Sequence, residues 1–168
     1  MRLAIPSPRV TLIILGVNIG IFLLALTALL FSQFTASSFF DTLVSFLSLN
    51  PRAVIEQGSF FTLFTSMFTH FSFMHLLVNM ISLFFIGSFV ERLIGSRKYI
   101  WFYLISGLVA GLFFVAFAYL GTVIPQGSAL FGSVDSAAVG ASGALFGIGG
   151  LLVVLLPRLP VLVFFVLP

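Results

Sequence analysis

MHLLVNMISLFFIGSFVERLI, residues 74–94, is long enough to cross a bilayer as a helix, because about 20 apolar residues span the hydrocarbon core. His75 and Asn79 lie in its first half, four residues apart, which puts both on one helical face. Polar side chains inside a span usually face the bundle or a water-filled cavity, since exposing them to lipid is costly. The stretch therefore predicts a membrane helix with one polar face.

The rest of the chain has the same apolar character. Its 168 residues are 61% hydrophobic and 7% charged, whereas an average soluble domain is about 25% charged. The apolar residues form long continuous runs rather than the alternation of a β-barrel, so we expect an all-α, polytopic membrane bundle. The chain has no cysteine, which excludes disulfides and cysteine-ligated metals. Its net charge of +3 is too small and scattered for a nucleic-acid surface.

Hydropathy predicts one membrane domain over residues 1–168. Besides 74–94, spans are expected at about 10–31, 100–120 and 140–156, and a fifth apolar run begins at about 161. The first run is too long for the apolar core of a signal peptide, so we expect it to be retained. Because the fifth run stops at Pro168, well short of a span, we expect a C-terminally truncated fragment. The patches within residues 32–69 are too short to span, so this segment is expected to lie in the interface or fold back into the protein.

Basic residues predict the orientation, because cytoplasmic loops are enriched in Lys and Arg. The first long loop carries one basic residue, Arg52, and the loop at 121–139 carries none. The other six share one side if the N-terminus is cytoplasmic: Arg2, Arg9, Arg92, Arg97, Lys98 and Arg158. We therefore expect a multi-pass protein, in the cell membrane, with a cytoplasmic N-terminus.

This orientation places three reactive side chains at one depth. The 74–94 span runs from outside to inside, so His75 and Asn79 lie in its outer half. The 140–156 span also enters from outside, which puts Ser142 near its outer end.

The stretch GASGALFG, residues 140–147, has two interpretations. Gly143 and Gly147 form a GxxxG pattern, as do Gly107 and Gly111 on the preceding span, and small residues at this spacing let membrane helices approach closely. Serine in a membrane helix often bonds only to a carbonyl one turn back. Ser142 could instead be a nucleophile, but that role requires an activating base.

His75 and Asn79 also allow two interpretations. They could make interhelical hydrogen bonds, or they could donate hydrogen bonds to a developing oxyanion. A metal bound by His70 and His75 would need a third ligand, for which Asp135 and Glu56 are candidates only by default. We expect neither a metal nor a cofactor.

Two stretches of the sequence together resemble the rhomboid family of intramembrane serine proteases. They are FTHFSFMHLLVNMISLFFIGSFVERLIGSRKYIWFYLISGLVAG, residues 68–111, and VGASGALFG, residues 139–147. The resemblance covers residues 48–156 and rests on His-x-x-x-Asn, on the Gly-x-x-x-Glu-Arg exit at Gly87 to Arg92, and on Gly-x-Ser-Gly. It implies six helices around a cavity that opens outward, and substrates that are transmembrane segments cut near their outer ends.

The resemblance also implies roles for individual residues. Ser142 matches the nucleophile, while His75 and Asn79 match the residues that stabilise the oxyanion together with the serine's own N–H. Gly140 and Gly143 match small positions that admit the substrate and the neighbouring helix.

The chain departs from the family pattern in two places. Where rhomboids often carry a Trp-Arg pair in the first loop, this chain has GSFFT, residues 58–62, which lacks the arginine that would anchor the loop. The family's base is a histidine on the sixth span, and neither His70 nor His75 matches it. We therefore expect a serine protease as the full-length protein and no activity from this chain alone.

A non-catalytic rhomboid-like protein that binds membrane clients is the alternative. A channel or transporter has little support, because the chain shows neither an inverted repeat nor a run of intramembrane charge. The lipid bilayer and transmembrane substrates are the expected partners. The sequence leaves the oligomeric state open, since GxxxG can serve contacts within one chain or between two.

Overall fold

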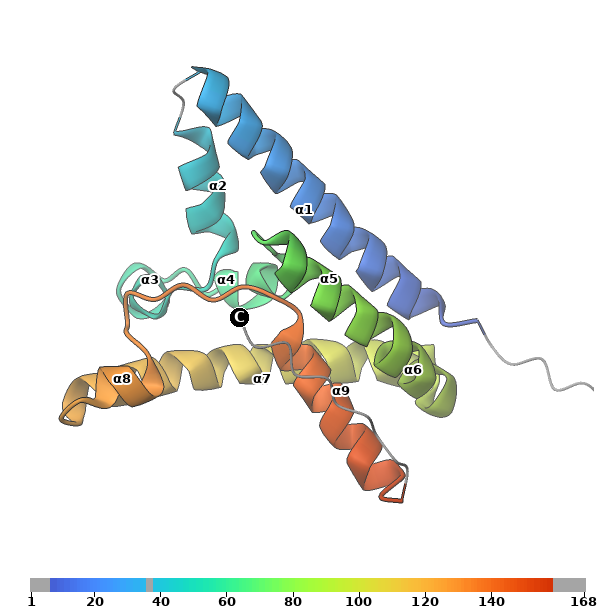
Figure 1. Cartoon of the computed structure of the whole chain (residues 1–168). Coiled ribbons are helices and arrows are strands. Elements are labelled where there is room, and N and C mark those ends of the chain that lie inside the picture. The colour runs from blue at the N-terminus through green and yellow to red at the C-terminus, as the bar shows by residue number, and fades with distance from the viewer. Residues whose placement is uncertain (1–6, 36–37, 159–168) are drawn as a thin grey trace, which may run out of the picture.

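The computed structural model describes residues 7–35 and 38–158, and every regular element within these ranges is a helix (Figure 1). The predicted all-α membrane bundle is therefore confirmed. Three helical stretches are long and apolar enough to cross a membrane. They are α1 (Arg9–Thr35), the continuous run of α5 (Phe73–Ser82), η2 (Leu83–Gly87) and α6 (Ser88–Ile94), and α7 (Ser96–Val123).

The fourth apolar helix, α9 (Ser142–Leu155), is shorter than the span predicted at 140–156. Its 14 residues rise about 21 Å at 1.5 Å per residue. It begins only at Ser142 because Ala138 and Gly140 make main-chain hydrogen bonds to the first loop instead of entering the helix. The fifth span expected from about 161 lies outside the described residues.

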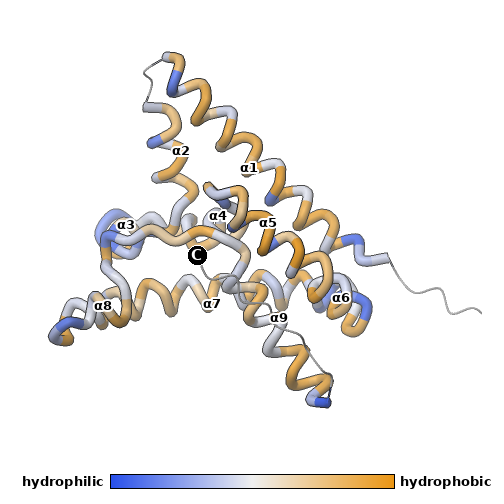
Figure 2. Tube along the Cα trace, in the orientation of Figure 1, coloured by the Kyte–Doolittle hydropathy of each residue, from blue (hydrophilic) through white to orange (hydrophobic). Residues whose placement is uncertain are grey.

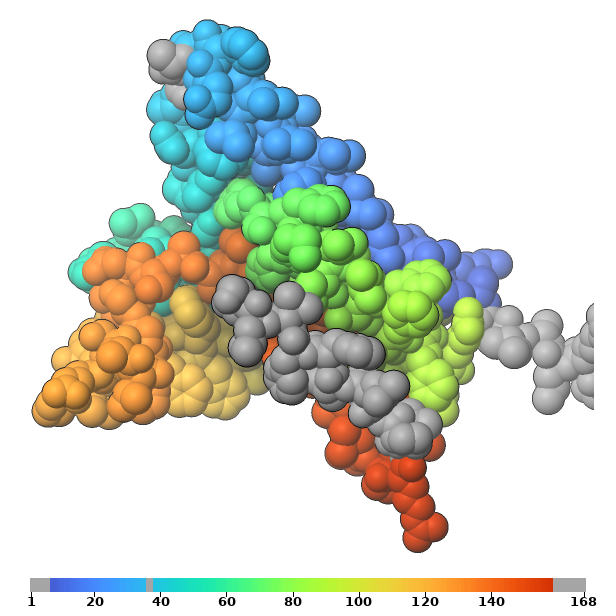
Figure 3. All heavy atoms as spheres, in the orientation of Figure 1, coloured from blue at the N-terminus to red at the C-terminus, as the bar shows by residue number. Residues whose placement is uncertain are grey.

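The first loop folds into short helices. They are α2 (Phe39–Leu47), α3 (Pro51–Gln57), α4 (Thr62–Thr65) and the 3₁₀ turn η1 (Ser66–Phe68). Asn50 caps α3 by accepting a hydrogen bond from Ala53 N, and Pro51 fits the first helical turn. Helix α2 buries none of its residues in the protein and packs along α1, forming the arm that projects in Figure 3. In contrast, α4 and η1 fold back against α7, with Leu63 and Met67 buried.

Glu91 joins three helices at one end of the bundle. Its carboxylate is buried, at 2% exposure, and accepts hydrogen bonds from Val10 N at 3.0 Å and from both Thr11 N and Thr11 Oγ1 at 2.7 Å. Ser96 Oγ, at the start of α7, donates to it at 2.6 Å. A carboxylate at the start of α1 satisfies amides that have no helical acceptor and complements the helix dipole. The start of α1 and the α6–α7 turn are thereby held together.

Helices α7 and α9 pack through the glycines of α9. A Cβ on Gly143 would lie 2.6 Å from Ala110 Cβ, and one on Gly147 would overlap Ser106. The glycines of the second GxxxG pattern, on α7, face the first loop instead: Gly107 receives Met67 and Gly111 receives Leu63. The two GxxxG patterns predicted close packing. The glycines of α9 pack against α7, whereas the glycines of α7 pack against the first loop.

Hydropathy follows this arrangement (Figure 2). Apolar residues cover the long helices. Many of them are exposed on the surface of the protein, such as Phe34, which is 87% exposed, and Trp101, which is 60% exposed. Hydrophilic residues gather at the start of α1, at α6 and at α3 (Figure 2). An apolar exterior suits contact with lipid, in which helices satisfy their own backbone groups.

Candidate active site

Helix α5 presents His75 and Asn79 one turn apart. Asn79 is 5% exposed, and its Nδ2 donates to His75 O at 2.8 Å. This bond uses one of the two amide hydrogens and fixes the orientation of the side chain. The His75 ring is half-buried. The sequence predicted both residues on one face, and the structure places them there.

Gly140 brings the chain before α9 directly against His75. Its φ of +119° lies in a region that side-chain-bearing residues rarely adopt. A Cβ at this position would lie 2.7 Å from His75 Cε1 and 2.8 Å from His75 Nε2. Gly140 N donates to Ser66 O at 2.8 Å, which fixes this segment against η1. Only glycine fits here without strain or collision.

Ser142 is the first residue of α9, two residues after Gly140. Two residues extend the chain by at most about 7 Å, so the Ser142 backbone lies close to the His75 ring. The first main-chain bond of this turn runs from Leu145 N to Ala141 O. The amides before it, including that of Ser142, have no helical acceptor and favour negative charge. Helices α5 and α9 are in contact in the structure.

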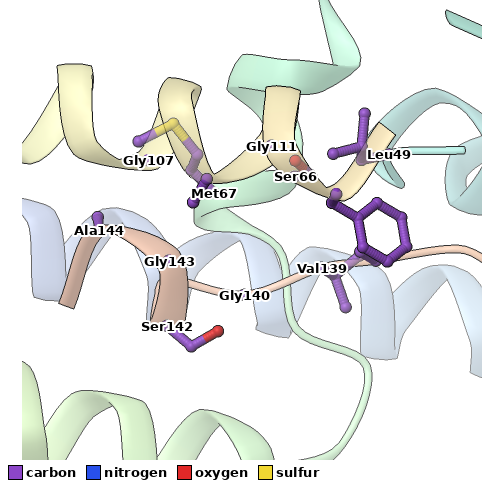
Figure 4. A pocket seen from close by; sticks show the side chains of 13 residues that line it. Leu49, Ser66, Met67, Gly107, Gly111, Val139, Gly140, Ser142, Gly143 and Ala144 are labelled. Carbon is purple, nitrogen blue, oxygen red and sulfur yellow. The ribbon is translucent and has the colours of Figure 1, made fainter. Parts of the chain in front are cut away.

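A small cavity of about 170 Å³ adjoins Ser142 (Figure 4). Its walls include small residues of α7 and α9 and two residues of η1, namely Gly107, Gly111, Gly143, Ala144, Ser66 and Met67. In Figure 4 the Ser142 side chain is turned away from Met67 and Gly107. The lining is mostly apolar, with serine hydroxyls as its polar side chains.

His70 packs against the candidate site from the loop before α5. It is fully buried, and its ring meets that of His75 edge-on, with centroids 4.8 Å apart. Neither ring nitrogen has a hydrogen-bond partner among the described residues. Burial first, and the neighbouring His75 second, lower the pKa of His70 to about 4. The ring is therefore neutral at physiological pH.

The two carboxylates considered as a third metal ligand are engaged by Arg52 rather than by the histidines. Asp135 and Glu56 are both bound to Arg52, at 2.7 Å and 3.2 Å respectively. Within residues 7–35 and 38–158, no group of three His, Cys, Asp or Glu side chains is arranged to hold a metal ion. The two histidines thus lie together without a third ligand from the described part of the chain.

Sequence reasoning missed three of these contacts: those of His70 with His75, Ser66 with Gly140, and Arg52 with Asp135. The last two join loop residues far apart in the sequence, and His70 lies five residues before His75, outside α5, so helical periodicity predicts none of the three contacts. The glycine at position 140 was the available sequence signal, since glycine adopts a positive φ more readily than any other residue.

Comparison with known proteins identifies the family. The rhomboid domain matches residues 57–168, which is most of the chain. This protein belongs to the rhomboid family. The predicted resemblance is thereby confirmed.

Relatives of this rhomboid include both named proteases and an inactive protein. It is 33% identical to the rhomboid protease GluP of Bacillus subtilis (strain 168) over 117 residues, which are 69% of this chain and 20% of that one. It is 29% identical to the putative rhomboid protease YdcA of the same organism over 129 residues, 77% of this chain and 58% of that one. It is 31% identical to the Inactive RHOMBOID-like protein 8 of Arabidopsis thaliana over 96 residues, 57% of this chain and 27% of that one.

The chain therefore spans between a fifth and about three-fifths of the length of these relatives. Because one relative is named inactive, membership of the rhomboid family does not by itself establish proteolysis.

Proposed function

We propose that this rhomboid, as the full-length protein, is an intramembrane serine endopeptidase that cleaves transmembrane segments of membrane proteins. The supporting observation is the contact of Gly140 with the His75 ring, two residues before Ser142. The contact supports the proposal because it lies at the N-terminus of the helix that Ser142 begins and involves His75, whose carbonyl accepts a hydrogen bond from Asn79.

In this proposal Ser142 Oγ attacks the carbonyl carbon of the scissile peptide bond. Its proton passes to a general base, and the carbonyl oxygen becomes an oxyanion that accepts hydrogen bonds from His75, Asn79 and the Ser142 amide. The C–N bond then breaks, the leaving amine takes the proton, and an acyl-enzyme remains. Water adds to the acyl carbon and releases Ser142 and the new carboxyl end.

The proposed base is a histidine other than the two in this chain. His75 is assigned to the oxyanion, and His70 is buried behind it with a lowered pKa. The resemblance to rhomboids puts the base on a later span. Residues 1–168 alone should therefore not turn over peptides.

The proposed orientation has a cytoplasmic N-terminus. The bonds of Glu91 hold the start of α1 at the α6–α7 turn, and both places carry basic residues. Water and the outer ends of substrate helices would then reach Ser142 from outside. Residues 1–168 contain no cysteine. Compared with the labelling of the unsubstituted protein, a Gln126→Cys variant should gain reaction with an impermeant maleimide in intact cells, and a Lys98→Cys variant should not. The reverse pattern would contradict this orientation.

The proteolytic function is tested by reconstitution. Full-length protein in liposomes is expected to cleave a transmembrane peptide in its outer half, and Ser142→Ala should abolish cleavage. Cleavage that continues unchanged in Ser142→Ala would refute the assignment of the nucleophile.

A second candidate is a non-catalytic protein that binds membrane clients, favoured by the match to a relative named inactive. It predicts that the wild type retains a transmembrane client without cutting it. Ser142→Ala should then leave client binding unchanged. Cleavage that depends on Ser142 would exclude this candidate.

A further inference from the structure

Arg52 and Asp135 join the first loop to the loop that precedes Ser142. Arg52 Nε donates to Asp135 Oδ1 at 2.7 Å, and its second guanidinium nitrogen donates to Oδ2 at 3.1 Å. This two-point geometry is the strongest that an arginine and a carboxylate form, and a lysine cannot reproduce it. The guanidinium also reaches Glu56 on its own helix, at 3.2 Å.

Main-chain bonds continue the same connection toward the site. Arg52 N donates to Val134 O at 3.1 Å, and Asn50 Nδ2 donates to Asp135 O at 3.2 Å. Leu49 and Ala138 exchange both of their main-chain bonds at 2.9 Å, as an isolated antiparallel bridge. The last fixed point, Gly140 N to Ser66 O, lies two residues before Ser142.

These bonds fix the register of residues 134–140 against residues 49–52. A slip by one residue would turn Gly140 away from the His75 ring, and a residue with a side chain would take its place. The close contact at His75 tolerates no Cβ. The position of Ser142 relative to α5 therefore depends on this register.

An isolated exposed ion pair contributes little, because solvent screens it. Here both charges are partly exposed, with side-chain exposures of 44% and 66%. The pair is nevertheless the only part of the connection that depends on side-chain charge, and its geometry is bidentate. Its effect is expected on the position of the loop more than on the overall free energy of unfolding.

We propose that Arg52 is a positioning residue for Ser142, holding the loop 134–140 in register through Asp135; the proposal rests on the proposed serine protease function. In this rhomboid the first loop has GSFFT where the family often carries a Trp-Arg pair. Arg52 on α3 anchors the loop from a different position.

The test uses the full-length protein and its reaction with a fluorophosphonate. Arg52→Ala and Asp135→Ala should each lower the second-order labelling constant and kcat by about 10- to 100-fold, because a displacement of about 1 Å has effects of that order. KM should stay near the wild-type value. The double variant should be no worse than either single one, and the exchange Arg52→Asp with Asp135→Arg should recover part of the rate.

Glu56→Ala is the matched control, since Glu56 contacts Arg52 but not the loop before Ser142. It should label like the wild type. Amide hydrogen exchange supplies a readout that needs no activity: Arg52→Ala should raise exchange across residues 134–142, and Glu56→Ala should not.

Three results would overturn the positioning role. They are an unchanged labelling constant in Arg52→Ala, additive effects in the double variant, or unchanged exchange in residues 134–142. A wild-type protein that neither reacts with the probe nor cleaves a substrate would instead refute the proposed function, and the exchange experiment would then decide alone whether Arg52 holds the loop.

Discussion

Replacing Gly143 by alanine tests the packing of α9 on α7. A Cβ at this position would lie 2.6 Å from Ala110 Cβ, whereas carbon atoms in contact are ordinarily about 3.5–4.0 Å apart. The helices would have to separate by about 1 Å at this level. Overpacking of this kind costs about 1–3 kcal/mol, and the higher helix propensity of alanine returns at most about 1 kcal/mol. We expect a net loss of stability of about 1–2 kcal/mol.

The free energy of unfolding in detergent or bicelles measures this loss. Gly20→Ala in α1 is the control, because a Cβ there meets nothing within 4 Å, and it should be neutral or slightly stabilising. Adding Ala110→Gly to Gly143→Ala should restore most of the loss, since it removes the colliding methyl group. If Gly143→Ala matches Gly20→Ala, or if Ala110→Gly gives no rescue, the packing described for α7 and α9 is wrong.

Three other predictions concern the site and its support. Asn79→Ala should lower kcat of the full-length protein by about 10- to 1000-fold, as expected for one lost oxyanion donor, with KM little changed; an unchanged kcat would remove Asn79 from this role. Glu91→Gln should lower the free energy of unfolding by about 3 kcal/mol, since a buried charged acceptor of four hydrogen bonds is lost, while exposed Glu56→Gln should change it by less than about 0.5 kcal/mol. Because the pKa of His70 is lowered from 6.5 to about 4, folding favours the neutral ring, so stability should be full above pH 6.5 and fall as the pH drops from 6.5 through 4. His70→Phe should flatten that dependence, and an equally steep fall in the variant would contradict the assignment.

The long helices could be predicted from the sequence because lipid imposes a simple rule. A span needs about 20 apolar residues, and the runs near α1, α5 to α6, and α7 satisfy it. Hydropathy overestimated α9, because residues 140 and 141 are as apolar or small as the helix that follows. Gly140 N instead donates to Ser66 O in the first loop, and nothing in the composition of this stretch reveals that partner.

The roles of Ser142, His75 and Asn79 stay predictions, and the loop contacts around them were not predicted from the sequence. The orientation set by the basic residues brought Ser142 to the level of His75 and Asn79, and the structure places Ser142 two residues from the contact at His75. The contacts of Arg52 and Ser66 with the loop before α9 join residues far apart in the chain. Such pairings depend on how the first loop folds back against α7. The loop sequence has no periodic pattern that predicts this folding.

The GxxxG patterns show the same limit of local sequence signals, which predict a close contact but not its partner. The spacing predicted close approach at Gly107 and at Gly143, and both glycines are closely approached. It could not say which neighbour each would meet. Gly143 meets α7, whereas Gly107 meets Met67 of the first loop, because the partner of a small residue is set by the topology around it.

Covalent labelling determines whether Ser142 is an activated nucleophile. Full-length protein in a bilayer is treated with a fluorophosphonate, and the modified peptide is identified by mass spectrometry. We expect a single adduct on Ser142, which is absent from Ser142→Ala and forms more slowly in Asn79→Ala. A folded protein that carries no adduct, or one labelled equally well after Ser142→Ala, would contradict it.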